Sequence, residues 1–448
     1  MTRPVVHIVG AGLAGLAAAV RLIDAHGPAG VEVVVYEAAR QAGGRCRSYY
    51  DSALGMVIDN GNHLMLSGNR AAMGFLKRVG GLGAVSIPAR AEYPFADLAT
   101  GERWTLRPNA GPIPWWIFVP GRRVPGAGWR AHLGLAALLR GGADRRIDAV
   151  MSCEGVAYER LWRPFLLAAL NLDPAEGSTR LAGAIVRESL ARGGAACRPV
   201  VADGLSAALI EPAIAYLAAR GAFVRLDHRL RAISFDGERA AALDFGDARA
   251  KLGPADQLIL ATPAPVAQDL LPGLTAPTRH RAILNAHFKL APPPGAPKIL
   301  GLVNATAEWI FAFENRISVT VSAADALLEH GREALAERLW ADVAKAYALA
   351  KPLPSWQVIK EKRATFAATP EENALRPGQD TRFANVTLAG DWTDTGLPAT
   401  IEGAIRSGER AADLATQALK GQARRAGDGS TAAQESFLEN PRKKRGNP

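Results

Sequence analysis

Short apolar runs alternate with a helical segment at the start of the chain. Val5 to Val9 is a short apolar run with one histidine at its centre, typical of a strand that is buried on both faces of a parallel sheet. An Ala- and Leu-rich segment then predicts a helix that ends at about Ala25. A second apolar run, from Val31 to Tyr36, predicts another buried strand. This order of strand, helix and strand indicates an α/β fold with a parallel sheet.

Three later segments show strand patterns that could join the same sheet. Residues 221–235 alternate like a strand or hairpin and end at a turn, Asp236-Gly237. Residues 256–260 and 386–389 read as two further buried strands. The second of these leads into Gly390-Asp391-Trp392-Thr393 and a helix predicted from about Ala399.

Glycines separate the first predicted strand from its helix. Gly10, Gly12 and Gly15 form a GxGxxG pattern, and Glu37 stands 22 residues after the third glycine. The first glycine permits a tight turn, the second a close approach of a pyrophosphate, and the third close packing of helix on sheet. The helix N-terminus offers free amides to that pyrophosphate, and the acid accepts ribose hydroxyls. The predicted dinucleotide contacts are Gly10, Gly12, Leu13, Ala14, Gly15, Glu37 and Ala38.

Composition excludes several classes of protein. The 448 residues are 48% hydrophobic and 21% charged, a globular balance that is long enough for two or three domains. Three distant cysteines give neither a disulfide framework nor a metal-ligand spacing, so we expect no metal and a reducing, cytoplasmic location. No run of 18 apolar residues is long enough to cross a membrane.

The net charge of +10 favours an anionic partner. Because no nucleic-acid-binding motif accompanies it, we expect no nucleic acid. Peripheral contact with the inner face of the cell membrane is the preferred explanation, and a merely soluble basic surface is the alternative.

Two segments decide which dinucleotide is bound. Residues 40–48 resemble the RxxGGRxxS/T extension of flavoproteins in the amine oxidase and carotenoid desaturase superfamily, and residues 390–393 resemble its C-terminal flavin motif. This resemblance implies FAD. Asp391 would then bind the ribityl chain, the helix amides near Thr400 and Ile401 the pyrimidine edge, and a backbone group near Leu230 the adenine. The further FAD contacts it implies are Arg40, Gly43, Gly44, Arg45, Gly390, Asp391, Thr400, Ile401 and Leu230.

The resemblance also implies a chain that leaves the nucleotide-binding domain and returns to it. We expect a discontinuous Rossmann-type FAD-binding domain of residues 1–75, 205–262 and 365–420. Residues 76–204 and 263–364 would form an interleaved α+β substrate-binding domain. The polar, charged segment 421–448 predicts a disordered basic tail.

Three segments are similar to one branch of the superfamily, the hydroxysqualene dehydroxylases: residues 59–69, 361–370 and 390–404. In the first of them Gly61, Asn62 and His63 are further candidate contacts for FAD. This resemblance implies FADH2-dependent conversion of hydroxysqualene to squalene in hopanoid or related triterpenoid synthesis, with hydride from flavin N5. The partner would be a hydrophobic C30 isoprenoid. A second dinucleotide pattern is not found, so electrons would come from another carrier or a transiently bound nicotinamide.

Loss of an allylic hydroxyl also needs a proton donor. His63 and Asp394 are the candidate catalytic residues, and Glu402 is a third possible acid, because their motifs lie near the expected flavin. His63 packing against the flavin or core, and Asp394 capping a turn, remain open alternatives. Arg363 could orient a polar group or form a surface ion pair.

Residues 112–123 are a candidate membrane-docking segment. Trp115 and Trp116 suit a membrane interface, and the two arginines that follow suit anionic head groups. The alternative is that these rings fill the core of the substrate domain or line its tunnel.

Two other functions compete with the dehydroxylase. A carotenoid-type desaturase or an amine oxidase would use the same fold oxidatively. A prenyl-lipid escort protein would need no flavin, which would leave Glu37, the loop 40–45 and Asp391 without a role.

Overall fold

A computed structural model describes residues 3–438 of the chain. A five-stranded parallel sheet collects strands from almost the whole length of the sequence. Its order is β10 (Phe223–Arg225), β2 (Glu32–Tyr36), β1 (Val5–Val9), β14 (Gln257–Leu260) and β20 (Val386–Leu388). The predicted strand–helix–strand unit is thus present, and the later apolar runs return to the same sheet.

Helices α1 (Leu13–Gly30) and α9 (Ile401–Leu438) pack against each other beside this sheet. A Cβ atom at Gly408 would lie 2.0 Å from the carbonyl oxygen of Ala14, so only glycine permits this contact. Gly27 has φ +64 inside α1, which ends the regular helix close to the predicted Ala25.

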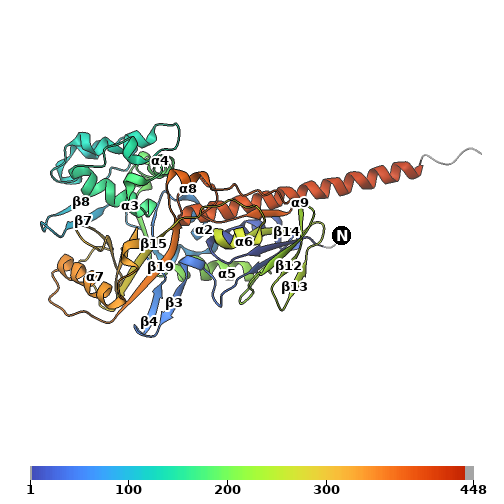
Figure 1. Ribbon diagram of the computed structural model, residues 1–448, viewed down its shortest axis with the longest axis horizontal. Coiled ribbons are helices and arrows are strands. Elements are labelled where there is room, and N and C mark those ends of the chain that lie inside the picture. Colours follow the sequence, from blue (N-terminus) through green and yellow to red (C-terminus); the bar gives the residue numbers. More distant parts are fainter. Residues whose placement is uncertain (1–2, 439–448) are drawn as a thin grey trace, which may run out of the picture.

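The seven-stranded sheet is the second large layer. Its order is β19 (Trp356–Phe366), β15 (His280–Phe288), β18 (Ile317–Val321), β17 (Trp309–Ala312), β16 (Ile299–Val303), β7 (Tyr93–Asp97) and β8 (Arg103–Leu106). One face packs on α7 (Arg332–Tyr347) through an apolar cluster that contains Leu284, Val319 and Leu339. Figure 1 shows α7 at one end of the molecule and α9 extending beyond the other end.

Smaller elements complete the fold. Three more sheets are present: β3 (Ser48–Asp51) with β4 (Met56–Asp59); β5 (Leu64–Leu66), β9 (Pro199–Ala202) and β6 (Val85–Ser86); and β11 (Ala232–Asp236), β12 (Arg239–Asp244) and β13 (Arg249–Lys251). The further helices are α2 (Arg70–Val79), α3 (Arg163–Leu170), α4 (Thr179–Glu188), α5 (Glu211–Ala218), α6 (Ala264–Leu270) and α8 (Pro370–Ala374). The turn between β11 and β12 falls at the predicted Asp236-Gly237.

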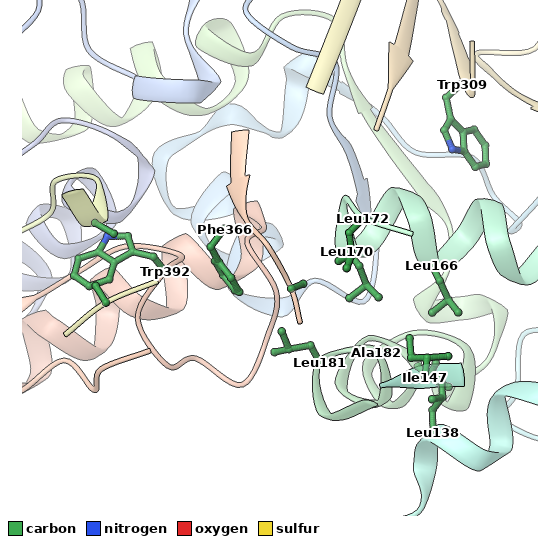
Figure 2. Packing of buried hydrophobic residues seen from close by; sticks show 14 of the residues in the cluster. Leu138, Ile147, Leu166, Leu170, Leu172, Leu181, Ala182, Trp309, Phe366 and Trp392 are labelled. Atoms are coloured by element: carbon green, nitrogen blue, oxygen red, sulfur yellow. The ribbon is translucent and has the colours of Figure 1, made fainter. Parts of the chain in front are cut away.

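The largest apolar cluster joins the two main sheets. It reaches from Trp392 and Phe366 to the leucines of α3 and the face of β17 that carries Trp309, as Figure 2 shows. The sequence predicts two domains, and this shared core lies between their principal sheets. The exact domain boundaries stay a prediction.

Disorder of the tail stays a prediction. Residues 421–438 are described as the last turns of α9. Gly- and Ser-containing sequence is a poor helix former in isolation, and the preceding turns of α9 supply the nucleus that such a segment needs. The remainder of the predicted tail, 439–448, lies outside the described residues.

Candidate functional site

The glycine pattern forms the turn between β1 and α1. Gly10 has φ +108, and a Cβ at Gly15 would lie 1.9 Å from the carbonyl oxygen of Gly10. Around Gly12, by contrast, nothing lies within 4 Å of a Cβ position, and no side chain caps the first turn of α1. The amides of this helix end are therefore available to an anionic group.

Glu37 lies at the end of β2, next to this turn. Its carboxylate accepts the amides of Ala11 and Ala39, each at 2.9 Å. Each oxygen keeps lone pairs for further donors, such as the hydroxyls of a ribose. The backbone of Glu37 also bonds to Arg225 and His228, which brings the chain before Leu230 to this side of the sheet. Contact of the Leu230 region with adenine stays a prediction.

The arginine–glycine loop folds back onto the glycine turn. Gly43 has φ +112 and donates its amide to the carbonyl of Ala11 at 2.8 Å. The Cβ position of Gly44 lies 3.4 Å from Cα of Gly12. Arg40 is exposed and 3.7 Å from Asp227, so in this structure it lies on the surface beside the site.

Arg45 joins the two ends of the chain. Its guanidinium donates to the carboxylate of Asp391 at 2.6 Å and to the carbonyl of Ala364. The Asp391 carboxylate is the largest cause that raises the pKa of Arg45. The N-terminal and C-terminal motifs therefore meet through an ion pair across 346 positions of sequence.

The three segments that resemble one branch of the superfamily converge here. Asn60 donates to Glu361 at 3.1 Å, which joins the first and second segments. Arg45 then bridges the second and third through Ala364 and Asp391. At the start of α9, Thr400 accepts the amide of Gly403 at 3.0 Å and so acts as the N-cap.

His63 is half-buried near the Arg45–Asp391 pair, which we call the junction. The pKa of its imidazole is lowered to about 4, because the effect of burial outweighs the opposing field of Asp59; Arg45 adds to the lowering and Asp391 opposes it. At neutral pH the ring is uncharged. The neighbouring Asn62 donates to Val319 and Thr320, while its Oδ1 is buried without a hydrogen-bond partner among the described residues.

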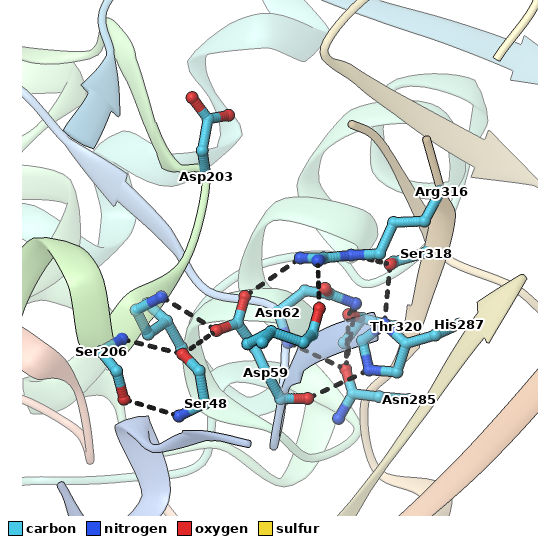
Figure 3. Close-up of polar contacts among 12 residues, drawn as sticks. Ser48, Asp59, Asn62, Asp203, Ser206, Asn285, His287, Arg316, Ser318 and Thr320 are labelled. Atoms are coloured by element: carbon cyan, nitrogen blue, oxygen red, sulfur yellow. Dashed lines mark hydrogen bonds and ion pairs between the residues drawn. The ribbon is translucent and has the colours of Figure 1, made fainter. Parts of the chain in front are cut away.

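A buried polar network holds the segment of His63 against the seven-stranded sheet. Asp59 pairs with Arg316 at 3.2 Å and accepts the hydroxyl of Ser48 at 2.6 Å. His287 bonds to Ser318 and to the carbonyl of Asp59, and burial lowers its pKa to about 3. Figure 3 shows Asp59 between Ser48, which lies on β3, and Arg316 and His287, which lie at the seven-stranded sheet.

The other predicted acids have structural partners. Asp394 is exposed and accepts the amide of Gly396 at 3.1 Å, the turn-capping alternative that the sequence left open. Glu402 is buried and accepts the amides of Ala71 and Ala72 at the start of α2, so its carboxylate caps a helix. Arg363 is exposed. The carboxylates of Asp394 and Glu402 are therefore both engaged as acceptors of backbone amides.

Arg376 is a site residue that sequence reasoning missed. It is buried and donates to the carbonyls of Asp391 and Thr393, and its guanidinium lies 4.8 Å from the ring centre of Phe366. Burial lowers its pKa to about 10. Arg376 thus fixes the backbone of the loop that carries Asp391. A lone arginine before Pro-Gly carries no sequence signal for this role.

The residues around the junction fit FAD. The open helix end at Gly12, the carboxylate of Glu37 and the Arg45–Asp391 pair suit the pyrophosphate, ribose and ribityl groups in turn. Thr262, at the end of β14, also has a buried hydroxyl with no partner among the described residues. Polar groups of this kind are costly unless a ligand or water satisfies them.

The two adjacent tryptophans of the docking segment differ. Trp116 is buried, and its ring lies nearly perpendicular to that of His132 with 5.7 Å between the ring centres. Membrane contact through Trp116 is therefore not supported. Trp115 is 48% exposed, with Arg122 4.7 Å above its ring. The short 3-10 helix Trp115–Phe118 turns consecutive side chains to different sides, which separates the two rings.

Two further observations concern the described residues alone. Between residues 3 and 438, no helix combines the length and apolar character needed to cross a bilayer, and no group of three metal-ligating side chains occurs. Cys46 is buried next to Arg45, and burial raises its pKa to about 12, so the thiol stays protonated.

Comparison with known proteins places the chain among flavoproteins. A model of the family described as flavin containing amine oxidoreductase matches residues 13–416. The chain is 53% identical over 411 residues to the hydroxysqualene dehydroxylase of Rhodopseudomonas palustris, covering 91% of this chain and 97% of that protein. Its identity to the same-named protein of Sinorhizobium fredii is also 53%, with 92% and 98% coverage.

A solved structure with the same architecture is the cyclohexylamine oxidase of Brevibacterium oxydans. The TM-score is 0.68 at 15% identity, and the alignment covers 93% of this chain and 99% of that one. At this identity the likeness concerns the fold alone.

Proposed function

The chain belongs to the flavin-containing amine oxidoreductase family and is an FAD-dependent oxidoreductase, and we propose that it reduces hydroxysqualene to squalene in hopanoid or related triterpenoid synthesis. The convergence of the three branch segments on the Arg45–Asp391 pair carries this proposal. The two full-length relatives that share 53% identity bear the same name, hydroxysqualene dehydroxylase.

The proposed reaction breaks a carbon–oxygen bond and forms a carbon–hydrogen bond. Bound FADH2 would supply the hydride, and the overall reaction would convert hydroxysqualene and FADH2 to squalene, water and FAD. Electrons would reach FAD from another carrier or from a transiently bound nicotinamide. The chain itself contributes apolar side chains, and Trp309 and Phe366 belong to the cluster between the two main sheets. Apolar surroundings at the reacting carbon would protect a developing allylic cation from water.

We assign the proton transfer to His63 rather than Asp394. Asp394 is exposed and caps a turn, whereas His63 lies in the segment that the Asp59 network holds at the junction. With its pKa at about 4, the imidazole must take up a proton before it can deliver one to the leaving hydroxyl.

A single-turnover isotope experiment tests the reaction. Holoenzyme reduced in deuterated buffer should give squalene with deuterium at the former carbinol carbon, together with oxidised FAD. Squalene without deuterium there would eliminate hydride transfer from the flavin. A desaturated product that forms only with an electron acceptor would establish the oxidative alternative instead.

We also propose peripheral membrane contact through a docking face around Trp115. Of the large exposed hydrophobic side chains, seven lie between residues 113 and 139: Ile113, Trp115, Phe118, Val119, Trp129, Leu133 and Leu139. Phe118 and Trp129 contact each other with ring centres 5.3 Å apart. Exposed hydrophobic side chains that contact one another are typical of a binding interface.

Arginines border the docking face. Arg122 lies over Trp115 and Arg130 over Trp129, at 4.7 and 5.2 Å from the ring centres. Aromatic rings beside cationic side chains suit the interface of an anionic bilayer, where the rings enter the head-group layer and the arginines meet phosphates. A membrane is also where a nearly insoluble C30 substrate resides.

Liposome co-sedimentation tests the docking face. Binding should rise with the anionic lipid fraction and fall with salt, because salt screens surface attraction. Trp115→Ala with Phe118→Ala should reduce binding at least fivefold without loss of flavin. Phe223→Ala is the matched control, since Phe223 is 64% exposed on β10, outside the docking face. Equal binding of the double variant and wild type would remove the docking face from the proposal.

A further inference from the structure

An apolar pocket of about 370 Å³ lies between the small sheet of β9 and the β7–β8 edge of the seven-stranded sheet. Its apolar wall consists of Pro88, Pro94, Pro199, Val201, Pro297 and Ile299. The volume falls in the range of ligand pockets, roughly 300–1,000 Å³. Its four proline side chains make the wall apolar and conformationally restricted.

The charged residues of the wall already have partners. Glu92 pairs with Arg107 at 3.4 Å, and Lys298 pairs with Asp203 at 3.5 Å. Ser86 and Thr105 supply the remaining polar contacts. A ligand in this pocket therefore meets mainly hydrocarbon, and the chemistry of the wall favours an apolar chain over an ionic group.

On its inner side the pocket reaches the strand that follows His63. Val201 pairs with Leu64 on β5 and with Ser86 on β6. Leu64 comes directly after His63 and packs against the same apolar cluster as Val201 and Ile299. Val201 of the pocket wall is thus the direct strand partner of Leu64, the residue that follows His63.

On its outer side the pocket adjoins the docking face. Arg107, the partner of Glu92, donates its backbone amide to the carbonyl of Arg122 and its guanidinium to the carbonyl of Gly121. Arg122 in turn covers the ring of Trp115. A continuous series of contacts therefore leads from the docking face, past the pocket, to the segment of His63.

We propose that this pocket binds one end of the isoprenoid chain while the carbinol carbon lies at the flavin. This assignment rests on the proposed function and adds a binding site for the part of the substrate that does not react. Its volume is at the lower end of the range for ligand pockets, which suits a terminal portion of a C30 chain rather than the whole molecule.

Filling the pocket tests its role. Thr105→Trp places a large ring in the wall, and Thr100→Trp is the matched control on the exposed turn of the same hairpin. With reduced holoenzyme, kcat/KM for hydroxysqualene should fall at least tenfold in Thr105→Trp and less than twofold in Thr100→Trp. Unchanged kcat/KM in a Thr105→Trp variant that retains FAD would overturn the proposal.

Photolabelling of wild-type holoenzyme needs no variant and distinguishes failure of the pocket assignment from failure of the proposed reaction. A squalene analogue with a terminal diazirine should label peptides that contain residues 86–105, 199–201 or 297–299. Labelling elsewhere, with these peptides unmodified, would overturn the pocket assignment. If wild-type enzyme does not convert hydroxysqualene but the analogue still labels the wall, the proposed reaction fails and the hydrocarbon site stands. Ser86→Phe replaces Thr105→Trp if that variant loses its flavin.

Discussion

His63 combines a position near the Arg45–Asp391 pair with an unusually low basicity. Because desolvation lowers its pKa to about 4, the protonated fraction falls about tenfold for each pH unit above that value. If His63 delivers the proton, single-turnover oxidation of the reduced flavin should accelerate nearly tenfold per unit as pH falls from 7 to 5.5. Stopped-flow absorbance of the flavin measures this rate.

Two variants separate His63 from other pH effects. His63→Gln should be slower and nearly independent of pH, whereas Asp394→Asn should keep the wild-type slope because Asp394 caps a turn. A wild-type slope in His63→Gln would assign the proton to another group.

Among single residues, the sequence predicted those positions at which the backbone conformation permits only one type of residue. Gly10 and Gly15 stand where any Cβ would collide, so their spacing alone revealed the turn. Trp115 and Trp116 could not be told apart, because the contact of Trp116 with His132 depends on how the chain folds around it. Arg376 was missed for the same reason, since its partners are carbonyls that the sequence does not distinguish.

Helices α1 and α9 depend on one close contact. Gly408→Ala should lower stability by about 1–3 kcal/mol, because the new methyl group meets the carbonyl of Ala14 at 2.0 Å. Gly421→Ala, on the same helix with nothing within 4 Å, should be neutral or raise stability by up to about 1 kcal/mol through helix propensity. Denaturant unfolding of the holoenzyme measures both. Equal effects of the two variants would contradict a tight α1–α9 interface.

Among the elements, the buried strands of the five-stranded sheet were predictable from the sequence, and the pairing of strands in the seven-stranded sheet was not. Val5–Val9 is apolar at every position except His7 and matches the bounds of β1. In the other sheet, β7 pairs in parallel with β16, so that Phe95 lies beside Gly301. Nothing local in either strand indicates a partner two hundred residues away, because register there depends on the shared apolar cluster.

For the molecule as a whole, the Asp59–Arg316 pair connects the small β3–β4 sheet to the seven-stranded sheet. Both side chains are almost fully buried. Arg316→Met should therefore lower the free energy of unfolding by about 3–5 kcal/mol, because it leaves the carboxylate of Asp59 buried and uncompensated. Asp59→Asn with Arg316→Met should cost less than the Met variant alone. Additive losses in this double-mutant cycle would show that the pair is not energetically coupled.

The order of strands in the five-stranded sheet has a consequence for synthesis. β1 is made first, yet its neighbour β14 and the outer strand β20 come from residues 257–260 and 386–388. At ribosomal speeds of about 5–20 residues per second, roughly 20–75 s pass between the appearance of Gly15 and that of Asp391. Until then the nascent chain exposes an unpaired strand edge and lacks half of its flavin site. Capture of the cofactor is therefore expected only after Asp391 has been made, and ribosome-bound chains shorter than about residue 390 should carry no flavin.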